Sequence, residues 1–495
     1  MNLLDKTISY ISPSAGYRRQ AWREALSERS NYDAADVSRS GRNWRVINDS
    51  AEHMDAPERD LVRARARDLQ RNSDVACGVL SAFERNVIGR GISLQARTDN
   101  AEFNREAERL WKQWCRAKNC DVTGQQNFTQ MLRMALTQKK VDGGILFKKC
   151  YTKGGLVPFK LQALEVDELD VSQIRPKYKG NRVTGGIEYD AYNRPVGYWI
   201  KQYSIDGMSL SESKYYNAND IIFYWQKKRA SQIREISDLS QTISRVRDAN
   251  EFINAVSIKE RVAACLAVFI KRVLPNGGGF GRGGGGNDKR HSYEGKTLAP
   301  GMIAELNAGD ELDVVNPANS GSDSAEFLKV QQRMISSGQG LSYEAVSRDM
   351  SQTNYSSARQ AMIEDDNTYW PEAELLIERV MDEVYETFLI SCVLAGLLNA
   401  PGFWEDKLMY FEHQWVPSPR RWIDPSKEAT ANKIALTTGQ KTFQDICAEN
   451  GKDWEDQLAD MAKAINKAQE LGIDLGGILY GKSQGTGAAA GTSEE

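Results

Sequence analysis

Apolar residues recur at helical spacing from about residue 57 to residue 140, with polar and charged residues between them. This pattern predicts three helices, over about 57–88, 102–118 and 127–140, and Gly89 would end the first. Four arginines of the first helix leave two interpretations open. Arg63, Arg65, Arg67 and Arg71 either contact DNA or pair with Asp60, Asp68 and Asp74 on a solvated surface.

From 143 to 224 the pattern changes to the alternation that is typical of strands. Five segments there are rich in β-branched and aromatic residues: ILFKKCY, FKLQALEV, GGIEYD, PVGYWIKQY and IIFYWQ. Turn signals containing Gly, Asn and Pro separate them. We therefore expect an antiparallel β region that packs on the preceding helices.

A second helical pattern runs from about 231 to 273, and no proline interrupts residues 196–274. One helix of this length would be ~60 Å long, so either a single rod or a helix broken near Asn250 is expected. The glycine-rich segment 277–287 predicts a flexible loop. A further helix is expected over about 324–337.

Residues 341–359, LSYEAVSRDMSQTNYSSAR, lie between two helical patterns and are too polar for a core. Their Asp, Asn, Ser and Thr residues predict an exposed loop whose end caps a helix that begins near Ser356. Pro371 is expected to kink or restart that helix. A strand or irregular stretch over 408–422 and helices over 424–472 follow, and the small polar residues of 481–495 predict disorder.

The composition limits the possible functions. A length of 495 residues is enough for two or more domains, and a net charge of −3 gives no bulk attraction for DNA. Seven cysteines without a CxxC pair and three separated histidines predict reduced thiols in a cytosolic compartment and no zinc site. The longest apolar stretches, 262–270 and 389–398, are shorter than the ~20 residues of a membrane span, and the N-terminus lacks a signal-peptide pattern.

Motifs for enzymatic chemistry are weak. The G-x-G-x-x-G match at 279–284 lies in a glycine run outside any βαβ pattern, and no P-loop sequence is present. The consecutive acids Glu364, Asp365 and Asp366 suit a two-metal nuclease site if Glu372 or Asp349 joins them. Since consecutive helical residues point in different directions, a solvated acidic face is the other interpretation. We expect no metal and no cofactor.

Several short segments in a fixed order resemble the lambda-type portal protein family of tailed bacteriophages. They are YDAA at 32–35, RARDL at 65–69, NVIG at 86–89, GIEYD at 186–190, DPSKEA at 424–429 and GKDW at 451–454. Each segment is weak, and their order and spacing carry the resemblance over about 17–475. One departure precedes the long helix, where the family pattern is kept at Arg229, Gln232 and Arg234 and replaced at Ala230, Ser231, Glu235 and Ser237. An earlier start of that helix is the expected consequence.

The resemblance implies an α+β portal fold with mainly helical wing, stem and crown, an antiparallel β region in the wing and a small α/β clip. The implied parts are an N-terminal arm, 1–55; the wing, 56–239; stem helix 1, 240–274; the clip, 275–323; stem helix 2, 324–340; the tunnel loop, 341–356; a kinked channel-lining helix with a return to the wing, 357–423; the crown, 424–480; and a disordered tail, 481–495. For the Arg-rich arm, a partly disordered terminus is the other interpretation.

The resemblance also implies a function. The chain would be one subunit of a ring of about twelve copies around a DNA channel at the capsid vertex, acting in DNA packaging, retention and ejection rather than as an enzyme. It would assemble in the host cytoplasm and reside in the virion. The implied partners are further copies of the chain, double-stranded DNA bound without sequence specificity, the terminase large subunit at the clip, a major capsid or scaffold protein, and a head-completion or tail adaptor, with no membrane.

Five residues of the tunnel loop are the candidate DNA-channel site: Arg348, Asp349, Gln352, Thr353 and Asn354. Arg348 and Gln352 are predicted to face the DNA backbone, and Asp349 would offset excess attraction. The alternative is that these residues only cap and pair within the loop. Two other functions remain open, a metal-dependent nucleic-acid-processing enzyme and a head–tail adaptor that encloses no DNA.

Overall fold

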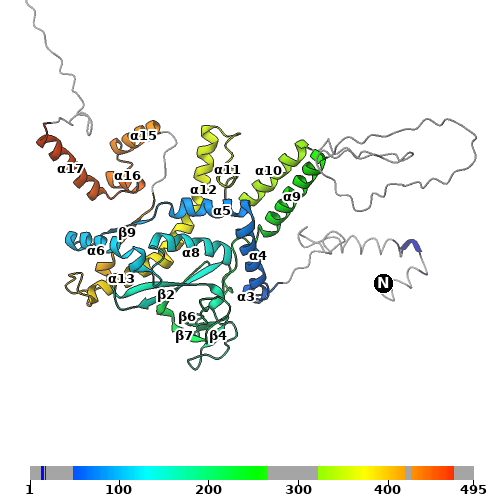
Figure 1. Cartoon of the computed structure of the whole chain (residues 1–495), viewed down its shortest axis with the longest axis horizontal. Helices are drawn as coiled ribbons and strands as arrows, with labels where there is room; N and C mark the ends of the chain where they lie inside the picture. The colour runs from blue at the N-terminus through cyan, green and yellow to red at the C-terminus, as the bar shows by residue number, and fades with distance from the viewer. Residues whose placement is uncertain are drawn as a thin grey trace, which may run out of the picture. The chain divides into compact units, whose positions relative to one another are not determined.

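The computed structural model describes residue 10, residues 13–15, residue 17, and residues 48–265, 321–418 and 425–472 (Figure 1). The chain divides into two units, Met1–Met54 and Asp55–Glu495. Apart from α3 (Ala51–Asp55), the description below concerns the second unit. Its described elements are helices and antiparallel strands, so the predicted α+β class is confirmed.

Helices occur in two blocks along the chain, before and after a block that holds most of the strands. The helical elements are α3 (Ala51–Asp55), α4 (Arg59–Asn72), α5 (Asp74–Phe83), η2 (Glu84–Ile88), α6 (Ala101–Trp114), α7 (Ala117–Cys120), α8 (Phe128–Asp142), η3 (Val166–Glu168), η4 (Ala218–Asp220), α9 (Ile243–Cys265), α10 (Gly321–Gly338), α11 (Tyr343–Ser347), α12 (Tyr355–Leu376), η5 (Ile377–Met381), α13 (Asp382–Leu394), α14 (Leu408–Phe411), α15 (Pro425–Thr437), α16 (Phe443–Glu449) and α17 (Trp454–Glu470). The strands are β1 (Ser93–Ala96), β2 (Gly144–Tyr151), β3 (Phe159–Leu164), β4 (Arg182–Thr184), β5 (Ile187–Tyr189), β6 (Pro195–Ile200), β7 (Lys214–Asn217), β8 (Ile221–Trp225) and β9 (His413–Val416).

The first predicted helix is divided into three pieces. α4 ends at Ser73, whose hydroxyl accepts a hydrogen bond from the backbone N–H of Ala76 and so caps the start of α5. The π-helical turn η2 follows α5 and ends at Gly89, which has a positive φ of 54°. The predicted stop at Gly89 is confirmed, whereas the break at Ser73 was not predicted.

The helix predicted over 127–140 is α8, and both of its ends have local causes. Asn127 and Gln130 form a reciprocal capping box at its start. Gly143 ends it with a φ of 93°, and a Cβ atom at this position would lie 2.5 Å from the backbone carbon of Ile236. The close approach lets the segment before α9 pass directly over the end of α8.

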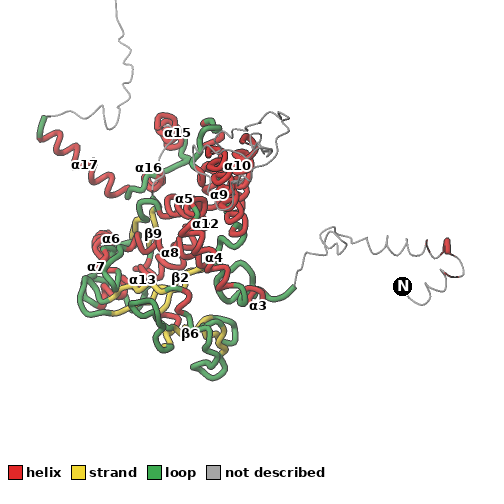
Figure 2. The backbone as a smooth tube through the Cα atoms, turned by 45° about the vertical axis from the view of Figure 1, so that its right-hand side comes forward, coloured by secondary structure: helices red, strands yellow, loops and turns green. Residues whose placement is uncertain are grey.

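Three antiparallel sheets are present in the described residues. β2 is the central strand of a three-stranded sheet in the order β3-β2-β8, and β4, β5, β6 and β7 form a four-stranded sheet in sequence order. Figure 2 shows the strands in yellow, with β2, β6 and β9 labelled. The third sheet pairs β1 with β9 and brings residue 93 opposite residue 416. The predicted antiparallel region over 143–224 is confirmed.

An aromatic cluster forms the centre of the main core. Trp114 is fully buried, stacks on Phe159 of β3 at 5.4 Å between ring centroids, and donates its indole N–H to the Phe159 carbonyl at 3.0 Å. Trp111 meets the rings of Tyr385 and Phe388 at 5.6 and 5.2 Å. Each such pair adds about 0.5–1.5 kcal/mol beyond area burial, so the cluster fixes α6 and α13 on the sheet.

The long helix begins later than predicted. α9 starts at Ile243 rather than near 231, and it continues through Asn250 without a break. It packs antiparallel against α10, since Gln339 donates to the hydroxyl of Thr242 at 3.0 Å while Phe252 meets Phe327 at 4.7 Å. The predictions of an earlier start and of a break near Asn250 are therefore wrong.

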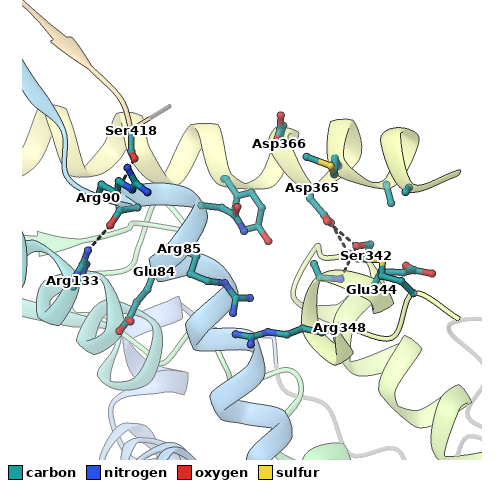
Figure 3. Close-up of a pocket in the computed structure, with 18 residues that line it drawn as sticks. Glu84, Arg85, Arg90, Arg133, Ser342, Glu344, Arg348, Asp365, Asp366 and Ser418 are labelled. Carbon is teal, nitrogen blue, oxygen red and sulfur yellow. Dashed lines mark hydrogen bonds between the residues drawn. The ribbon is translucent and has the colours of Figure 1, made fainter. Parts of the chain in front are cut away.

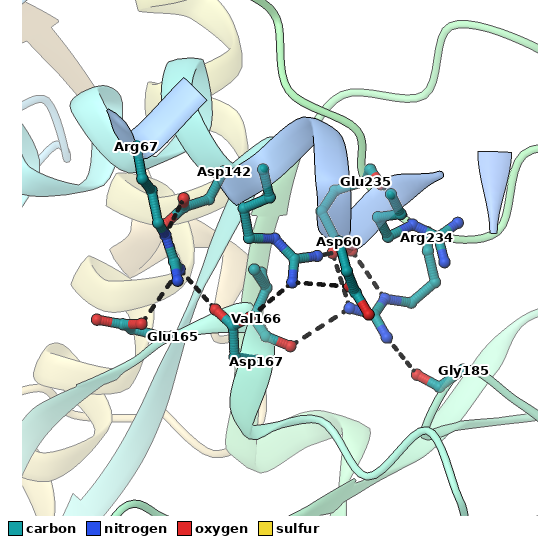
Figure 4. Close-up of polar contacts among 11 residues, drawn as sticks. Asp60, Arg67, Asp142, Glu165, Val166, Asp167, Gly185, Arg234 and Glu235 are labelled. Atoms are coloured by element: carbon teal, nitrogen blue, oxygen red, sulfur yellow. Dashed lines mark hydrogen bonds and ion pairs between the residues drawn. The ribbon is translucent and has the colours of Figure 1, made fainter. Parts of the chain in front are cut away.

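Buried charges explain the later start of α9. Glu235 has no exposed surface, and its carboxylate accepts two hydrogen bonds from Arg234, at 2.7 and 2.8 Å, and one from Arg63 of α4, at 3.0 Å (Figure 4). Arg234 also donates to the carbonyls of Gly185 and Val166. These contacts hold 232–237 in a non-helical course that a helix would destroy.

The same cluster corrects the interpretations for two of the four α4 arginines. Arg63 is buried, and besides Asp60 it binds Asp167 at 2.7 Å. Arg67 forms a bidentate pair with Asp142 at 2.7 and 3.0 Å (Figure 4). These two arginines therefore join α4 to α8 and η3, and their guanidinium groups are engaged by carboxylates. Arg65 and Arg71 are exposed, and both interpretations stay open for them.

A second buried charge cluster joins α8, the segment before α9 and α12. Lys139 has no exposed surface, and its ammonium group lies 2.9 Å from Asp238 and 2.7 Å from Glu372. Lys140 binds Glu372 at 2.5 Å and lies 4.0 Å above the ring of Phe83. Although burial by itself would raise it, the charges of the two lysines lower the pKa of Asp238 to about 2.

Pro371 does not interrupt its helix. α12 continues through Pro371 to Leu376, and the irregularity follows as the π-helical turn η5. The predicted restart at Pro371 is therefore wrong, whereas the predicted kink stays a prediction. The turn η5 leads directly into α13.

Only some of the remaining predicted segments lie within the described residues. The stretch predicted over 408–422 contains α14 and β9, and the C-terminal helical region contains α15, α16 and α17. The glycine-rich loop 277–287, most of the expected clip and the tail 481–495 lie outside the described residues, as does most of the arm.

Replacing Glu235 with glutamine should lower the free energy of unfolding at pH 7 by about 3–5 kcal/mol, because two buried guanidinium groups lose their counter-charge. Burial by itself would raise the pKa of Glu235, but the charges and hydrogen bonds of Arg234 and the charge of Arg63 outweigh it and lower the pKa. This stabilisation is complete above the unfolded-state pKa of about 4.3 and is lost as the pH falls through the lower folded-state value. Chemical unfolding between pH 7 and pH 3 should show the difference between the two proteins shrinking in acid.

Glu212, which is exposed between β6 and β7, provides the matched control. Glu212→Gln should change the free energy of unfolding by less than about 0.5 kcal/mol. An E235Q protein as stable as the parent at pH 7 would contradict the role given to this buried cluster.

Candidate functional site

The candidate loop is partly helical. After α10 ends at Gly338, the chain turns into the short helix α11 and then continues as an irregular segment to the start of α12. Leu341 and Val346 are buried, so the first half of the segment packs on the body. The prediction of an exposed loop over its whole length is corrected to an exposed tip that follows a packed helical turn.

Two contacts with α12 hold the base of this loop. Asp365 accepts hydrogen bonds from the backbone N–H and the hydroxyl of Ser342, at 2.6 and 2.7 Å (Figure 3). Ser342 in turn caps α11, because its hydroxyl accepts from the N–H of Ala345. Thr368 donates to the carbonyl of Gly340 at 2.5 Å. The loop is therefore anchored on a rigid helix.

Three of the five predicted site residues form hydrogen bonds within the loop. Asp349 accepts from the N–H of Ser351 at 3.0 Å, and Thr353 donates to the carbonyl of Met350 at 2.9 Å. Asn354 is the N-cap of α12 and exchanges hydrogen bonds with Ser357. The predicted helix cap is confirmed, and the hydrogen bond with Ser351 lowers the pKa of Asp349.

The other two predicted residues present their side chains differently. Arg348 has a φ of 59°, the left-handed conformation that ends α11, and its side chain lines a cleft where it points toward Arg85 (Figure 3). Gln352 lies on the exposed tip of the loop. The five residues are thus close in the chain, but they do not converge on one point.

The cleft lies between two walls and has a volume of about 1140 Å³. One wall comes from η2, the turn after it and α8, and it carries Arg85, Arg90 and Arg133. The other wall comes from α11, the segment after it and α12, with Met350, Met362 and three alanines. Sequence reasoning missed the first wall, since nothing local links η2 to a loop so much later in the chain.

The acidic residues considered for a metal site have other partners. Glu372 binds the two lysines of α8, and Asp365 binds Ser342. Asp365 and Asp366 point in different directions from α12 (Figure 3). Across the residues that the structure describes, no three His, Cys, Asp or Glu side chains are grouped so as to hold a metal ion. In the same residues, no helix has the length and apolar character needed to cross a bilayer.

Comparison with known proteins identifies relatives over most of the chain. The family described as phage portal protein, lambda family, matches residues 37–370. A probable portal protein of Halomonas phage phiHAP-1 is 25% identical over 442 residues, which cover 86% of this chain and 83% of that protein. Portal protein B of Escherichia phage lambda is 19% identical over 489 residues, which cover 91% of this chain and 92% of that protein.

Among solved structures, a chain in the virion of a native gene transfer agent particle is similar with a TM-score of 0.44 and 12% identity, covering 80% of this chain and 99% of that one. A chain in the neck of the native particle, computed with C12 symmetry, has a TM-score of 0.42 and 14% identity and covers 78% and 93%. The family match spans more than half of the sequence. The chain therefore belongs to the lambda family of phage portal proteins.

Proposed function

We propose that this portal protein forms a ring of about twelve subunits at the capsid vertex and that DNA passes through its centre. One observation supports the placement of the loop: its base is fixed to α12 through Ser342 and Asp365, while its tip is polar and exposed. A fixed base with a polar tip suits a constriction that contacts the DNA backbone and reads no base sequence. The tunnel loop is 341–356 in this proposal.

The antiparallel pair α9 and α10 fits the two stem helices, and the segment between them is the proposed clip, where the terminase large subunit would dock. The sheets and helices of 56–239 fit the wing, which would meet the capsid or scaffold protein. α15, α16 and α17 fit the crown. A head-completion or tail adaptor would complete the assembly, which forms in the host cytoplasm and remains in the virion.

The proposed work is mechanical rather than catalytic. The carboxylates of Glu372 and Asp365, which a nuclease would need for metal ions, are engaged by lysines and by Ser342. DNA cleavage by the purified protein with magnesium would instead support the enzyme alternative. An adaptor that encloses no DNA would lack a central hole in negative-stain images.

Deleting residues 350–353 should leave the ring intact and reduce DNA packaging or retention. The deletion keeps the cap at Asn354 and the Ser342–Asp365 anchor, and it removes only the exposed tip. Negative-stain images measure ring assembly, and the amount and length of DNA in particles from a complementation assay measure packaging. Deleting residues 206–209, an exposed hairpin tip in the four-stranded region, is the matched control and should change neither. Unchanged phage yield and packaged length in the 350–353 deletion would refute the role of the loop.

Arg348→Ala should weaken the salt dependence of DNA retention in filled heads. Each lysine or arginine that meets a phosphate contributes about 0.9 to the slope of log affinity against log salt concentration. Gln352→Ala removes an uncharged side chain from the same loop and should leave this slope unchanged. Release of DNA from filled heads across a salt series measures both variants, and equal slopes for Arg348→Ala and the parent would exclude a phosphate contact by Arg348.

A further inference from the structure

Two arginines without ionic partners point toward each other beside the tunnel loop (Figure 3). Arg348 comes from the end of α11, Arg85 comes from η2, and both side chains are exposed. Within the part of the chain that the structure describes, neither guanidinium group has a hydrogen-bond or ion-pair partner. Two like charges that converge in this way attract an anion.

The backbone of Arg348 is held in a conformation that favours glycine. Its φ is 59°, and its N–H donates to the carbonyl of Glu344 at 2.9 Å where α11 ends. Among the described residues, the only other non-glycine residue with a positive φ is Asn193, and asparagine tolerates this region better than arginine does. A helix end of this kind usually carries glycine, which would give the same backbone with less strain. Arginine at this position therefore indicates that its side chain has a role.

Close packing of α11 on α5 brings Arg348 to η2. Gly78 of α5 has no side chain, and a Cβ atom there would lie 3.0 Å from the carbonyl oxygen of Val346. The Val346 side chain is buried in the same contact region. Since η2 continues directly from α5, this contact places the end of α11 beside Arg85 (Figure 3). Both arginines are thus presented from a fixed backbone.

The cleft also contains four carboxylates, which lie apart from the two guanidinium groups (Figure 3). Glu84 points away from them and accepts a hydrogen bond from Thr137 at 2.6 Å. The other three carboxylates belong to α11 and α12: Glu344, Asp365 and Asp366. Burial raises the pKa of Asp365, the hydrogen bonds from Ser342 oppose this, and the charge of Glu344 raises the pKa further. The acids of the cleft therefore act on one another and do not neutralise the arginine pair.

We propose that Arg85 and Arg348 of one subunit together bind one phosphate group of the DNA backbone in the channel. Each guanidinium group presents a planar fork of N–H donors that matches the oxygens of a phosphate. The net charge of −3 gives the chain no bulk attraction for DNA, so local pairs of this kind must supply it. The inference rests on the proposed function, which brings DNA to the tunnel loop. A free phosphate ion offers the same oxygens, and the test separates the two sources.

The test uses the full-length protein and three variants, R85A, R348G and the double variant R85A/R348G. Fluorescence anisotropy of a labelled short DNA duplex, across a series of salt concentrations, measures binding. Each single variant should weaken binding at low salt about tenfold, because a charge-assisted hydrogen bond is lost. The double variant should weaken it by clearly less than the product of about 100-fold, because both arginines hold the same phosphate. Glycine adopts the backbone of Arg348 freely, so R348G should remain folded, as circular dichroism will show.

Two further variants serve as controls. Arg194 is exposed in the turn between β5 and β6, and R194A should bind the duplex with the affinity and the salt dependence of the parent. Arg85→Lys keeps the charge but loses the planar fork of donors. It should therefore keep the salt dependence of the parent and bind the duplex more weakly.

The outcomes separate this inference from the proposed function. If R85A and R348G bind the duplex as the parent does, or if their losses multiply in the double variant, the shared phosphate site is refuted while the ring stands. Calorimetric titration with inorganic phosphate tests the other source. If the variants lose phosphate binding but keep duplex binding, a free ion is the ligand and the DNA contact is refuted.

Negative-stain images of the same proteins complete the test. All variants should form the rings that the parent forms, because neither arginine is assigned to a subunit contact. Loss of rings in R85A or R348G would show that the pair meets a neighbouring subunit, and it would overturn the inference. A parent without a central hole would overturn the proposed function and, with it, the source of the phosphate.

Discussion

The buried charge of Glu235 constrains the centre of the structure, because a carboxylate without solvent must be neutralised where it lies. Arg63 of α4 and the adjacent Arg234 neutralise it, and Arg234 also binds the carbonyls of Gly185 and Val166. One carboxylate thereby ties together α4, η3, the turn before β5 and the segment before α9. That segment is not helical for this reason, and α9 begins from a fixed point.

A second cluster of buried charges fixes α12 to the same part of the structure. Lys139 and Lys140 of α8 bind both Asp238, which precedes α9, and Glu372 of α12. The start of α9 and the middle of α12 are thus held on the same helix. α12 also holds the base of the tunnel loop and forms part of one wall of the cleft. A fixed α12 therefore sets the position of the tunnel loop.

At the candidate site, local sequence patterns predicted some contacts and not others. The cap at Asn354 was predictable, because the residues that form it are neighbours in the chain. The partner of Asp365 was not, since Ser342 approaches it only after the chain has turned between α10 and α12. The cleft wall with Arg85 and Arg90 was also not predictable from local patterns. η2 lies far from the loop in the sequence, and the two come together only in the folded chain. The family resemblance located the loop but not the residues that surround it.

The sequence by itself determined the helix ends with capping residues, the antiparallel region and the family to which the chain belongs. These depend on neighbouring residues, on alternation, or on the order of short segments, and all three can be read along the chain. Only the tertiary structure decided which charged side chains are buried, where α9 begins and which face of α12 is exposed. Helical spacing is the same for an arginine in water and for an arginine against a buried carboxylate. The difference arises from partners that are distant in sequence, and they meet only in the folded chain.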